Sequence, residues 1–343
     1  MGAKKLLIFF LLFCIGLAGH TTICVAQEAI SGEDSDSYTL DELDIRGVLR
    51  RDELKSTSAT ILTNEMVNER VYYQTADFVN LSPGISVVQF GEAGMSPQVQ
   101  IRGFIDTNDM AFYLDGIPLH DNGHAAGFTD STVIMPIEIE SVEIIKGPAS
   151  VYYGPRSAAG TIAVQSIKSG NFTKLQLRYG SWNDINATGI IAREDKKLAQ
   201  VYAFEFFHSD GYRENSDWDR KNFSARWTYN ISDKLQTSLN IRAYNSEWDS
   251  AGYVSHLLNS KRGWVNDGSG SGNGNGGKRD RYDARLWANY LINDESQLTY
   301  YLYGTTLEFT RYQRSDRTMS NILNPSAPYP SMREQYITSV DNC

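Results

Sequence analysis

Cysteines and long apolar runs are both scarce in this sequence of 343 residues. Of its 3 cysteines, only Cys343 lies beyond residue 26, so the rest of the chain offers no disulfide framework and no cysteine metal site. No apolar run after residue 26 is long enough for a transmembrane helix. The motifs H-E-x-x-H and G-x-x-x-x-G-K-[ST] and a Cys–His pair are also missing, so we predict neither an enzyme nor a cofactor.

An excess of basic charge is lacking too. The 32 Lys and Arg residues are outnumbered by 41 Asp and Glu, and the formal net charge of −9 argues against a nucleic-acid binder. The chain begins like a secretory signal peptide, with Lys4 and Lys5 before an apolar run at 6–17 and small residues at 24–26. An exported chain without a transmembrane helix is periplasmic, external or a β-barrel of the outer membrane.

Residues 56–168 have the pattern of a compact α/β domain with short helices, short strands and glycine turns. Thr63 and Asn64 can cap a first helix, and Asp115-Gly116 is a tight turn. The Ala-Ala-Gly step that ends at Gly160 allows two backbones to approach closely. The expected elements are helical segments at 65–70 and 74–80 and strands at 87–89, 99–104, 110–119, 139–144 and 161–164.

From residue 171 onward, long segments alternate apolar and polar residues. A soluble β-sandwich shows the same alternation, but segments of about ten residues or more favour strands of a membrane β-barrel, with apolar side chains outward and polar ones inward. The expected strands are 172–180, 184–193, 198–208, 220–231, 234–245, 281–292 and 297–311. Short periplasmic turns then alternate with longer external connections at 208–221 and 245–280, and 314–343 is expected to be an external loop.

Aromatic residues cluster near the ends of these segments, as in the interface girdles of membrane barrels. This set is Tyr179, Trp182, Tyr212, Trp218, Tyr244, Trp248, Tyr300 and Tyr301.

Four short motifs stand in order within the α/β segment. They are L-S-P-G-I at 81–85, I-R-G-F at 101–104, Y-L-D-G-I-P-L at 113–119 and V-E-I-I-K-G-P followed by Y-Y-G at 142–154. In this order and spacing they resemble the plug domain of TonB-dependent outer-membrane receptors. The resemblance implies an α+β plug followed by part of a transmembrane antiparallel β-barrel, which has about 22 strands in the family and about seven here. The implied domains are a signal peptide at 1–26, a flexible periplasmic arm at 27–55, the plug at 56–168 and the first part of the barrel at 169–343.

The resemblance also implies a function. It is TonB-dependent active uptake of a scarce, bulky nutrient, such as a ferric siderophore or similar metal chelate, across the outer membrane of a Gram-negative bacterium. The implied partners are TonB with its inner-membrane energising complex, the small-molecule chelate and outer-membrane lipid. A non-transporting barrel that acts in adhesion or docking is an alternative, and a soluble α/β module joined to a β-sandwich is a third.

A short strand-prone segment lies in the acidic arm before the plug. It consists of Asp41, Glu42, Leu43, Asp44, Ile45, Arg46 and Gly47. It resembles the TonB box, which TonB captures by adding a strand through main-chain hydrogen bonds. Asp44 and Arg46 depart from the valine or threonine that is usual in the family.

Two basic residues match family positions at which the plug contacts the barrel. Arg102 and Lys146 lie in I-R-G and K-G-P, where the family has basic residues paired with carboxylates of the barrel wall. The resemblance places those carboxylates on later strands, beyond Cys343. Lys146 lacks the bidentate fork of an arginine, so its link is expected to be looser.

In the family, substrate binds where the apical plug loops meet the inner wall and the external loops. The matching candidates are Gln89, Phe90, Gln98, Asp106, Asn108, His120, Asp121, His124, Trp248, Tyr253 and Trp264. The three aromatic residues could contact a ferric chelate or a corrinoid, or could pack within their loop. His120, Asp121 and His124 could bind a metal in principle, but glycines break their loop, and no metal site is predicted.

Seven strands cannot close a barrel. An open edge in lipid leaves unpaired backbone groups, each of which costs several kcal/mol. We therefore expect the sequence to be a fragment of a longer chain, or else a truncated product that cannot insert alone.

Overall fold

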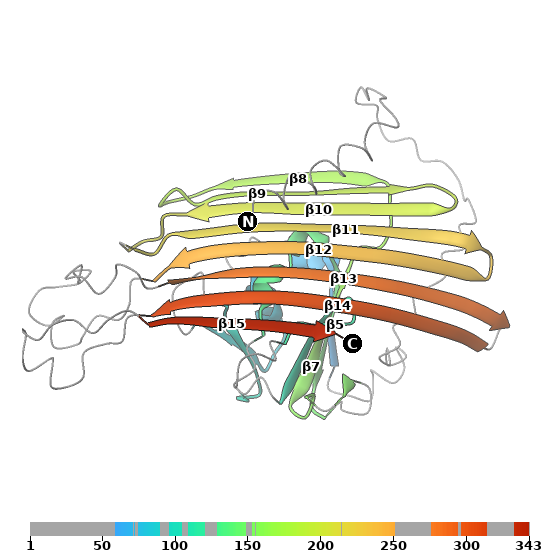
Figure 1. Ribbon diagram of the computed structural model, residues 1–343, viewed down its shortest axis with the longest axis horizontal. Helices are drawn as coiled ribbons and strands as arrows, with labels where there is room; N and C mark the ends of the chain where they lie inside the picture. Colours follow the sequence, from blue (N-terminus) through green and yellow to red (C-terminus); the bar gives the residue numbers. More distant parts are fainter. Residues whose placement is uncertain are drawn as a thin grey trace, which may run out of the picture. The chain divides into compact units, whose positions relative to one another are not determined.

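The computed structural model describes residues 59–70, 72, 75–89, 96–104, 109–120, 129–148, 153–154, 156–213, 215–250, 276–293, 296–313 and 333–342. These residues form three β-sheets, of five, two and eight strands. We call residues 59–166 the plug and the eight-stranded sheet the wall (Figure 1). Within the described residues, no helix combines the length and the apolar character needed to cross a membrane.

The plug is built on a sheet in which strands from distant parts of the chain are neighbours. Its order is β1-β6-β7-β4-β5, with β4 and β7 parallel and the other pairs antiparallel. The strands are β1 (Ala59–Thr63), β4 (Met110–Leu114), β5 (Ile117–Pro118), β6 (Ile139–Lys146) and β7 (Gly160–Ser166). The other elements are α3 (Asn64–Asn68), the 3-10 helices η1 (Thr75–Leu81), η2 (Ser131–Val133) and η3 (Pro136–Glu138), and the antiparallel pair β2 (Ile85–Val88) and β3 (Gln98–Ile101).

Apolar side chains of the sheet and of the short helices form the plug core. Leu62, Phe112 and Ile162 of the sheet and Val67 and Phe78 of the helices are at most 1% exposed. Burial of side chains of this size contributes about 1.5–3 kcal/mol each. This core fixes the strand ends and helical turns that carry the polar residues described below.

Local sequence signals place several plug elements as expected. Thr63 caps α3, and its hydroxyl accepts a backbone N–H of the helix. Asp115 and Gly116 turn β4 into β5 with φ values of 51° and 78°. Gly160 opens β7, and a Cβ there would collide with the carbonyl oxygen of Ile145, so the expected close approach of two backbones is confirmed.

The strand expected at 99–104 ends earlier. Arg102 and Gly103 both have positive φ, 51° and 84°, and form a turn instead. The turn brings Phe104 back to Ile101, and the two residues exchange backbone hydrogen bonds. The apolar pattern of the segment could not reveal this reversal, because arginine rarely adopts such a conformation.

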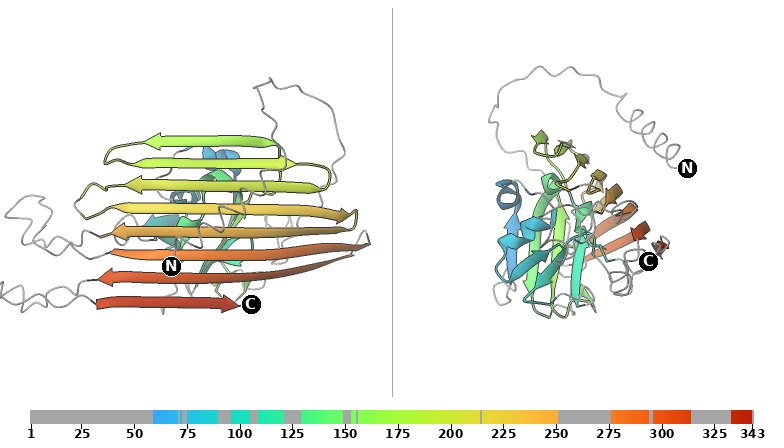
Figure 2. Two further views of the ribbon diagram at one scale, coloured as in Figure 1. Left: turned by 45° about the horizontal axis from the view of Figure 1, so that its top comes forward. Right: turned by 90° about the vertical axis from the view of Figure 1, so that its left-hand side faces the viewer.

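The wall is one antiparallel sheet in which each strand pairs with its neighbours in the chain (Figure 2). Its strands are β8 (Phe172–Tyr179), β9 (Ile185–Glu194), β10 (Leu198–Ser209), β11 (Trp218–Ser232), β12 (Leu235–Asp249), β13 (Gly276–Asn293), β14 (Ser296–Gln313) and β15 (Arg333–Asn342). This order confirms the expected fold, an α+β plug followed by antiparallel barrel strands.

The wall departs from the expected strands in number and in length. β15 is an eighth strand, within the segment 314–343 that was expected to be an external loop. β13 has 18 residues, which span about 60 Å, twice the bilayer core of about 30 Å. Its added part carries charged residues such as Lys278 and Asp280. Such residues resemble a loop in sequence, although their backbones are paired.

Alternation along the wall strands separates an inner from an outer face. In β12 the even-numbered residues 236–248 are buried, whereas their odd-numbered neighbours are partly or fully exposed. On the outer face, Leu239, Leu286 and Tyr290 are 42–47% exposed. The expected pattern of apolar residues outward and polar residues inward is confirmed for these strands.

Three of the expected girdle aromatics lie on the inner face instead. Trp218, Tyr244 and Trp248 are at most 3% exposed. They occupy inward positions of β11 and β12, so their place near strand ends does not make them interface residues.

Candidate functional site

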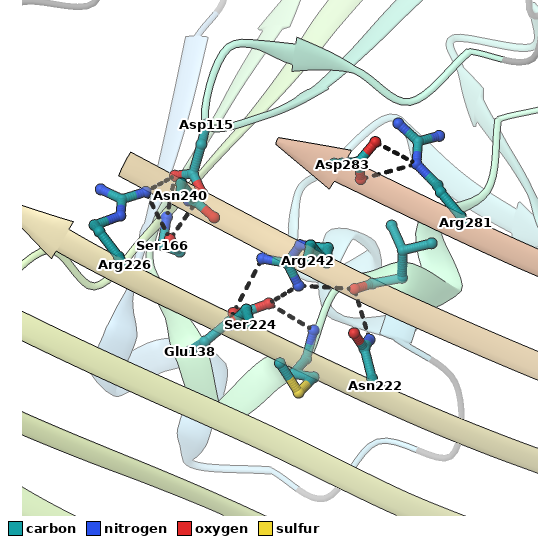
Figure 3. Close-up of polar contacts among 12 residues, drawn as sticks. Asp115, Glu138, Ser166, Asn222, Ser224, Arg226, Asn240, Arg242, Arg281 and Asp283 are labelled. Atoms are coloured by element: carbon teal, nitrogen blue, oxygen red, sulfur yellow. Dashed lines mark hydrogen bonds and ion pairs between the residues drawn. The ribbon is translucent and has the colours of Figure 1, made fainter. Parts of the chain in front are cut away.

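The first contact between plug and wall is centred on Asp115, in the turn between β4 and β5. Its carboxylate is 1% exposed and accepts four hydrogen bonds (Figure 3). Ser166 donates from its backbone N at 2.9 Å and from its hydroxyl at 2.8 Å. The wall supplies Arg226 at 2.8 Å and the side-chain amide of Asn240 at 3.1 Å. Every lone-pair direction of this buried carboxylate is thus used.

The second contact is centred on Glu138, at the end of η3. Arg242 of β12 binds it with both terminal nitrogens, at 2.6 and 3.1 Å (Figure 3). The hydroxyl of Ser224 donates at 2.6 Å, and the backbone N of Met135 donates at 3.2 Å from within the plug. The fork-shaped pair gives this contact a defined orientation.

The third contact is centred on Asp130, which caps η2. It accepts from the backbone N of Thr132 at 3.0 Å and from the guanidinium of Arg279 on β13 at 2.7 Å. The Thr132 hydroxyl also donates to Asp130, so it accepts a hydrogen bond at 2.6 Å from the hydroxyl of Tyr244.

Backbone carbonyls of the plug add further contacts with the wall. Val133 O accepts from Asn222 at 2.7 Å and from Arg242 at 3.0 Å. Arg281 donates to Pro118 O at 3.2 Å. The interface on β11, β12 and β13 is therefore polar, and its contacts come from the part of the plug between residues 115 and 166.

Each of the three plug carboxylates meets one wall arginine out of water. Burial alone would raise the pKa of Asp115 and of Asp130. Arg226 beside Asp115 and Arg279 beside Asp130 outweigh this effect, with help from hydrogen bonds, and hold both pKa values below the usual range. Since buried ion pairs recover little more than their desolvation cost, we interpret these pairs as fixing where the plug sits rather than as a source of large net stability.

The lowered pKa values predict how docking of the plug depends on pH. A group whose pKa is lowered in the docked state contributes stability above its ordinary pKa and loses it as pH falls through the lowered value. Docking should therefore be constant from about pH 8 to pH 5 and weaken only below the ordinary aspartate pKa of about 3.9. Protease protection of the plug in the complete receptor, followed against pH, measures this. Weakening between pH 7 and 5 would contradict it, and Asp115→Asn should reduce the acid-dependent loss.

The structure describes only some of the residues predicted to face substrate, and it brings Gln89 and Gln98 close together, since Val88 pairs with Gln98. Gln89 and Gln98 are half-buried beside β2 and in β3, and His120 forms a backbone bridge with Thr129. Whether these three face substrate stays a prediction. Several candidates lie outside the described residues, namely Phe90, Asp106, Asn108, Asp121, His124, Tyr253, Trp264 and the TonB-box-like segment 41–47.

The sequence had placed Trp248 in an external loop, and this prediction is wrong. It lies in β12, is 3% exposed and stacks on Phe309 of β14 with ring centroids 6.1 Å apart. It belongs to an inner-face aromatic cluster with Phe207 and Trp218. Strand pairing up to Asp249 explains the difference.

Arg102 and Lys146 lie together on the plug. Arg102 is exposed in its turn, and Lys146 donates to the hydroxyl of Thr60 at 3.0 Å. Burial, together with the charge of Arg102, lowers the pKa of Lys146. Their expected pairing with carboxylates of later wall strands stays a prediction.

The plug carboxylates were not predicted as wall contacts. The alternation of the expected strands 220–231 and 234–245 turns Arg226 and Arg242 inward but indicates no partner for either. Buried arginines require compensating carboxylates, so the inward positions were a usable signal. The sequence pattern could not identify Asp115 and Glu138 as the partners, because Glu138 and Arg242 are 104 residues apart in the chain.

Comparisons with known proteins agree with this architecture. The family model described as TonB-dependent Receptor Plug Domain matches residues 52–161. The chain is 28% identical over 214 residues to the vitamin B12 transporter BtuB of Vibrio vulnificus, over 57% of this chain and 34% of that protein. It is 32% identical over 113 residues to the ferrioxamine B receptor of Salmonella typhimurium, over 32% of this chain and 15% of that protein. The chain thus spans only part of the length of these relatives.

Solved structures show the same fold at low sequence identity. The unliganded ferric citrate transporter FecA aligns with a TM-score of 0.66 at 15% identity, over 80% of this chain and 43% of that chain. The copper transporter OprC aligns with a TM-score of 0.63 at 16% identity, over 81% of this chain and 40% of that chain. A plug docked on long antiparallel strands defines the plugged β-barrels of outer membranes. Within that class, residues 52–161 match the plug domain of TonB-dependent receptors, and the chain is similar in sequence and fold to such receptors of the outer membrane.

Proposed function

We propose that this chain acts in TonB-dependent active uptake of a scarce, bulky nutrient, a ferric siderophore or similar metal chelate, across the outer membrane. The observation that carries the proposal is the polar interface between the plug and strands β11, β12 and β13. Its hydrogen-bonding groups can exchange partners with water, so the plug can leave these three strands without exposing a large apolar surface there. A small apolar cluster, in which Met135 and Ile137 pack against β9 and β10, also joins the plug to the wall. If the plug only closed the barrel, an apolar contact would give its docked state more stability than buried ion pairs do.

The names of the relatives support the proposed substrate class. They are described as handling vitamin B12, ferrioxamine B, ferric citrate and copper. Apart from copper, these compounds are metal chelates. We extend this class, and no single member of it, to the present chain, with TonB as the energising partner through residues 41–47.

Uptake by the complete receptor tests the proposal. Cells that lack their own receptors for the test compounds would carry the complete gene and be given ⁵⁵Fe chelates or ⁵⁷Co-labelled cobalamin. We expect accumulation of at least one compound that stops when TonB is deleted, while binding at the cell surface remains. Surface binding without energised accumulation of any compound would contradict transport and favour the docking or adhesion alternative.

A further inference from the structure

Six arginines gather on the inner face of three neighbouring wall strands. None is more than 7% exposed. They are Arg220 and Arg226 of β11, Arg242 of β12, and Arg279, Arg281 and Arg285 of β13. We call them the arginine track.

The strand register orders the track along the wall. Four successive inward rows across β11, β12 and β13 begin at residues 220, 222, 224 and 226 of β11. The first row holds Arg220 and Arg279, and the second holds Arg281. The third holds Arg242, and the fourth holds Arg226 and Arg285. Neighbouring rows are about 7 Å apart, and the track is about 20 Å long. Every row therefore offers at least one guanidinium.

The plug occupies this track with carboxylates at both ends and in the middle. Asp130 binds the first row, Glu138 the third and Asp115 the fourth, each at 2.6–2.8 Å from a guanidinium. The wall itself supplies two further carboxylates, Glu205 to Arg220 of the first row at 2.7 Å and Asp283 to Arg281 of the second row at 3.0 Å. Movement of the plug would remove three of these five negative charges.

An arginine cannot respond by losing its proton, because its pKa exceeds about 12. If the plug carboxylate left and nothing replaced it, the arginine would keep its charge on a wall that had been dry. An unpaired buried guanidinium of this kind costs several kcal/mol. Water that enters as the plug leaves can solvate the guanidinium, but only an anion can neutralise its charge. Carboxylate and catecholate oxygens fit the guanidinium fork as the plug side chains do.

We propose that the arginine track is a relay for anions, in which oxyanion groups of the cargo take the places that Asp130, Glu138 and Asp115 leave. The proposal rests on the proposed transport function and narrows its substrate class to metal chelates that carry several outward carboxylate or catecholate groups. Because the rows are about 7 Å apart, a bulky chelate can bind the next row before it leaves the previous one. A neutral complex gains nothing from the track.

Chemical rescue tests the relay without knowledge of the cargo. In the purified complete receptor, Glu138→Ala leaves Arg242 without its carboxylate. The midpoint of thermal unfolding should fall, and citrate should restore part of the loss beyond the effect of chloride at equal ionic strength. The control Glu138→Ala/Arg242→Gln should gain nothing from citrate. If Glu138→Ala does not fold, the same rescue is measured at the pair of Asp130 and Arg279, with the variant Asp130→Asn. Absence of citrate-specific rescue in a folded variant would show that the arginines only hold the plug, and would overturn the relay.

A second measurement links the track to transport. Asp115→Asn/Arg226→Gln removes one ion pair but keeps polar groups of similar size. We expect uptake of an anionic ferric citrate or catecholate to fall by about tenfold or more, with unchanged surface binding and unchanged uptake of neutral cobalamin if that is imported. Equal effects on anionic and neutral compounds would argue against the relay. Failure of the wild-type receptor to import any compound would instead count against the proposed function, and the rescue experiment would still decide on the relay.

Discussion

Arg242→Ala in the complete receptor should make the free energy of plug docking less favourable by about 3–5 kcal/mol. The change leaves Glu138, at 2% exposure, with two neutral donors and no counter-charge. It also removes a hydrogen bond to the carbonyl of Val133. Limited proteolysis should cleave the plug of the variant faster, and thermal unfolding in detergent should begin at a lower temperature.

A matched control and a double variant sharpen this prediction. Arg193 of β9 is exposed, and its partners among the described residues are neighbours in the wall, so Arg193→Ala should leave protection of the plug unchanged. The double variant Glu138→Gln/Arg242→Gln leaves no unpaired charge at this contact and should cost less than Arg242→Ala alone. If Arg242→Ala behaved like the control, the pair would not contribute to docking.

Much of the fold could be predicted because its signals are local. Thr63, the Asp115-Gly116 turn and Gly160 act within a few residues, and their turns and caps form as expected. The wall strands followed from alternation along each segment. The signals fail where backbone pairing extends into polar sequence, as in β13 and β15, since pairing satisfies the backbone whichever side chains are present.

The interface was predicted only in part, because its contacts join distant segments. Arg279 and Asp130 are 149 residues apart, and the sequence around one of them does not predict the other as its partner. The family resemblance directed attention to Arg102 and Lys146 as basic plug residues with acidic partners on the wall. The structure adds pairs of the opposite sense, in which the plug supplies the carboxylates and the wall the arginines. Charge alternation along single strands could show that partners were needed but not which plug residues would supply them.

Ile45→Pro in the complete receptor should abolish energised uptake and spare binding at the cell surface. The proposed partner, TonB, would pair with residues 41–47 through main-chain hydrogen bonds. Proline removes the backbone N–H at its position and fixes φ, so it interrupts such a ladder. Side-chain changes such as Ile45→Ala should have much smaller effects, since the pairing is tolerant of sequence.

The arm offers its own control for this experiment. Ser37→Pro introduces the same residue outside the segment and should leave uptake intact. The plug begins its first strand only at Ala59, and the described contacts of the plug with the wall involve Tyr72 and later residues, so neither substitution removes one of these contacts. Loss of surface binding in Ile45→Pro would indicate a folding defect rather than a lost partner. Unchanged uptake would remove residues 41–47 from the proposed contact with TonB, because a strand added to this segment could not tolerate a proline at its centre.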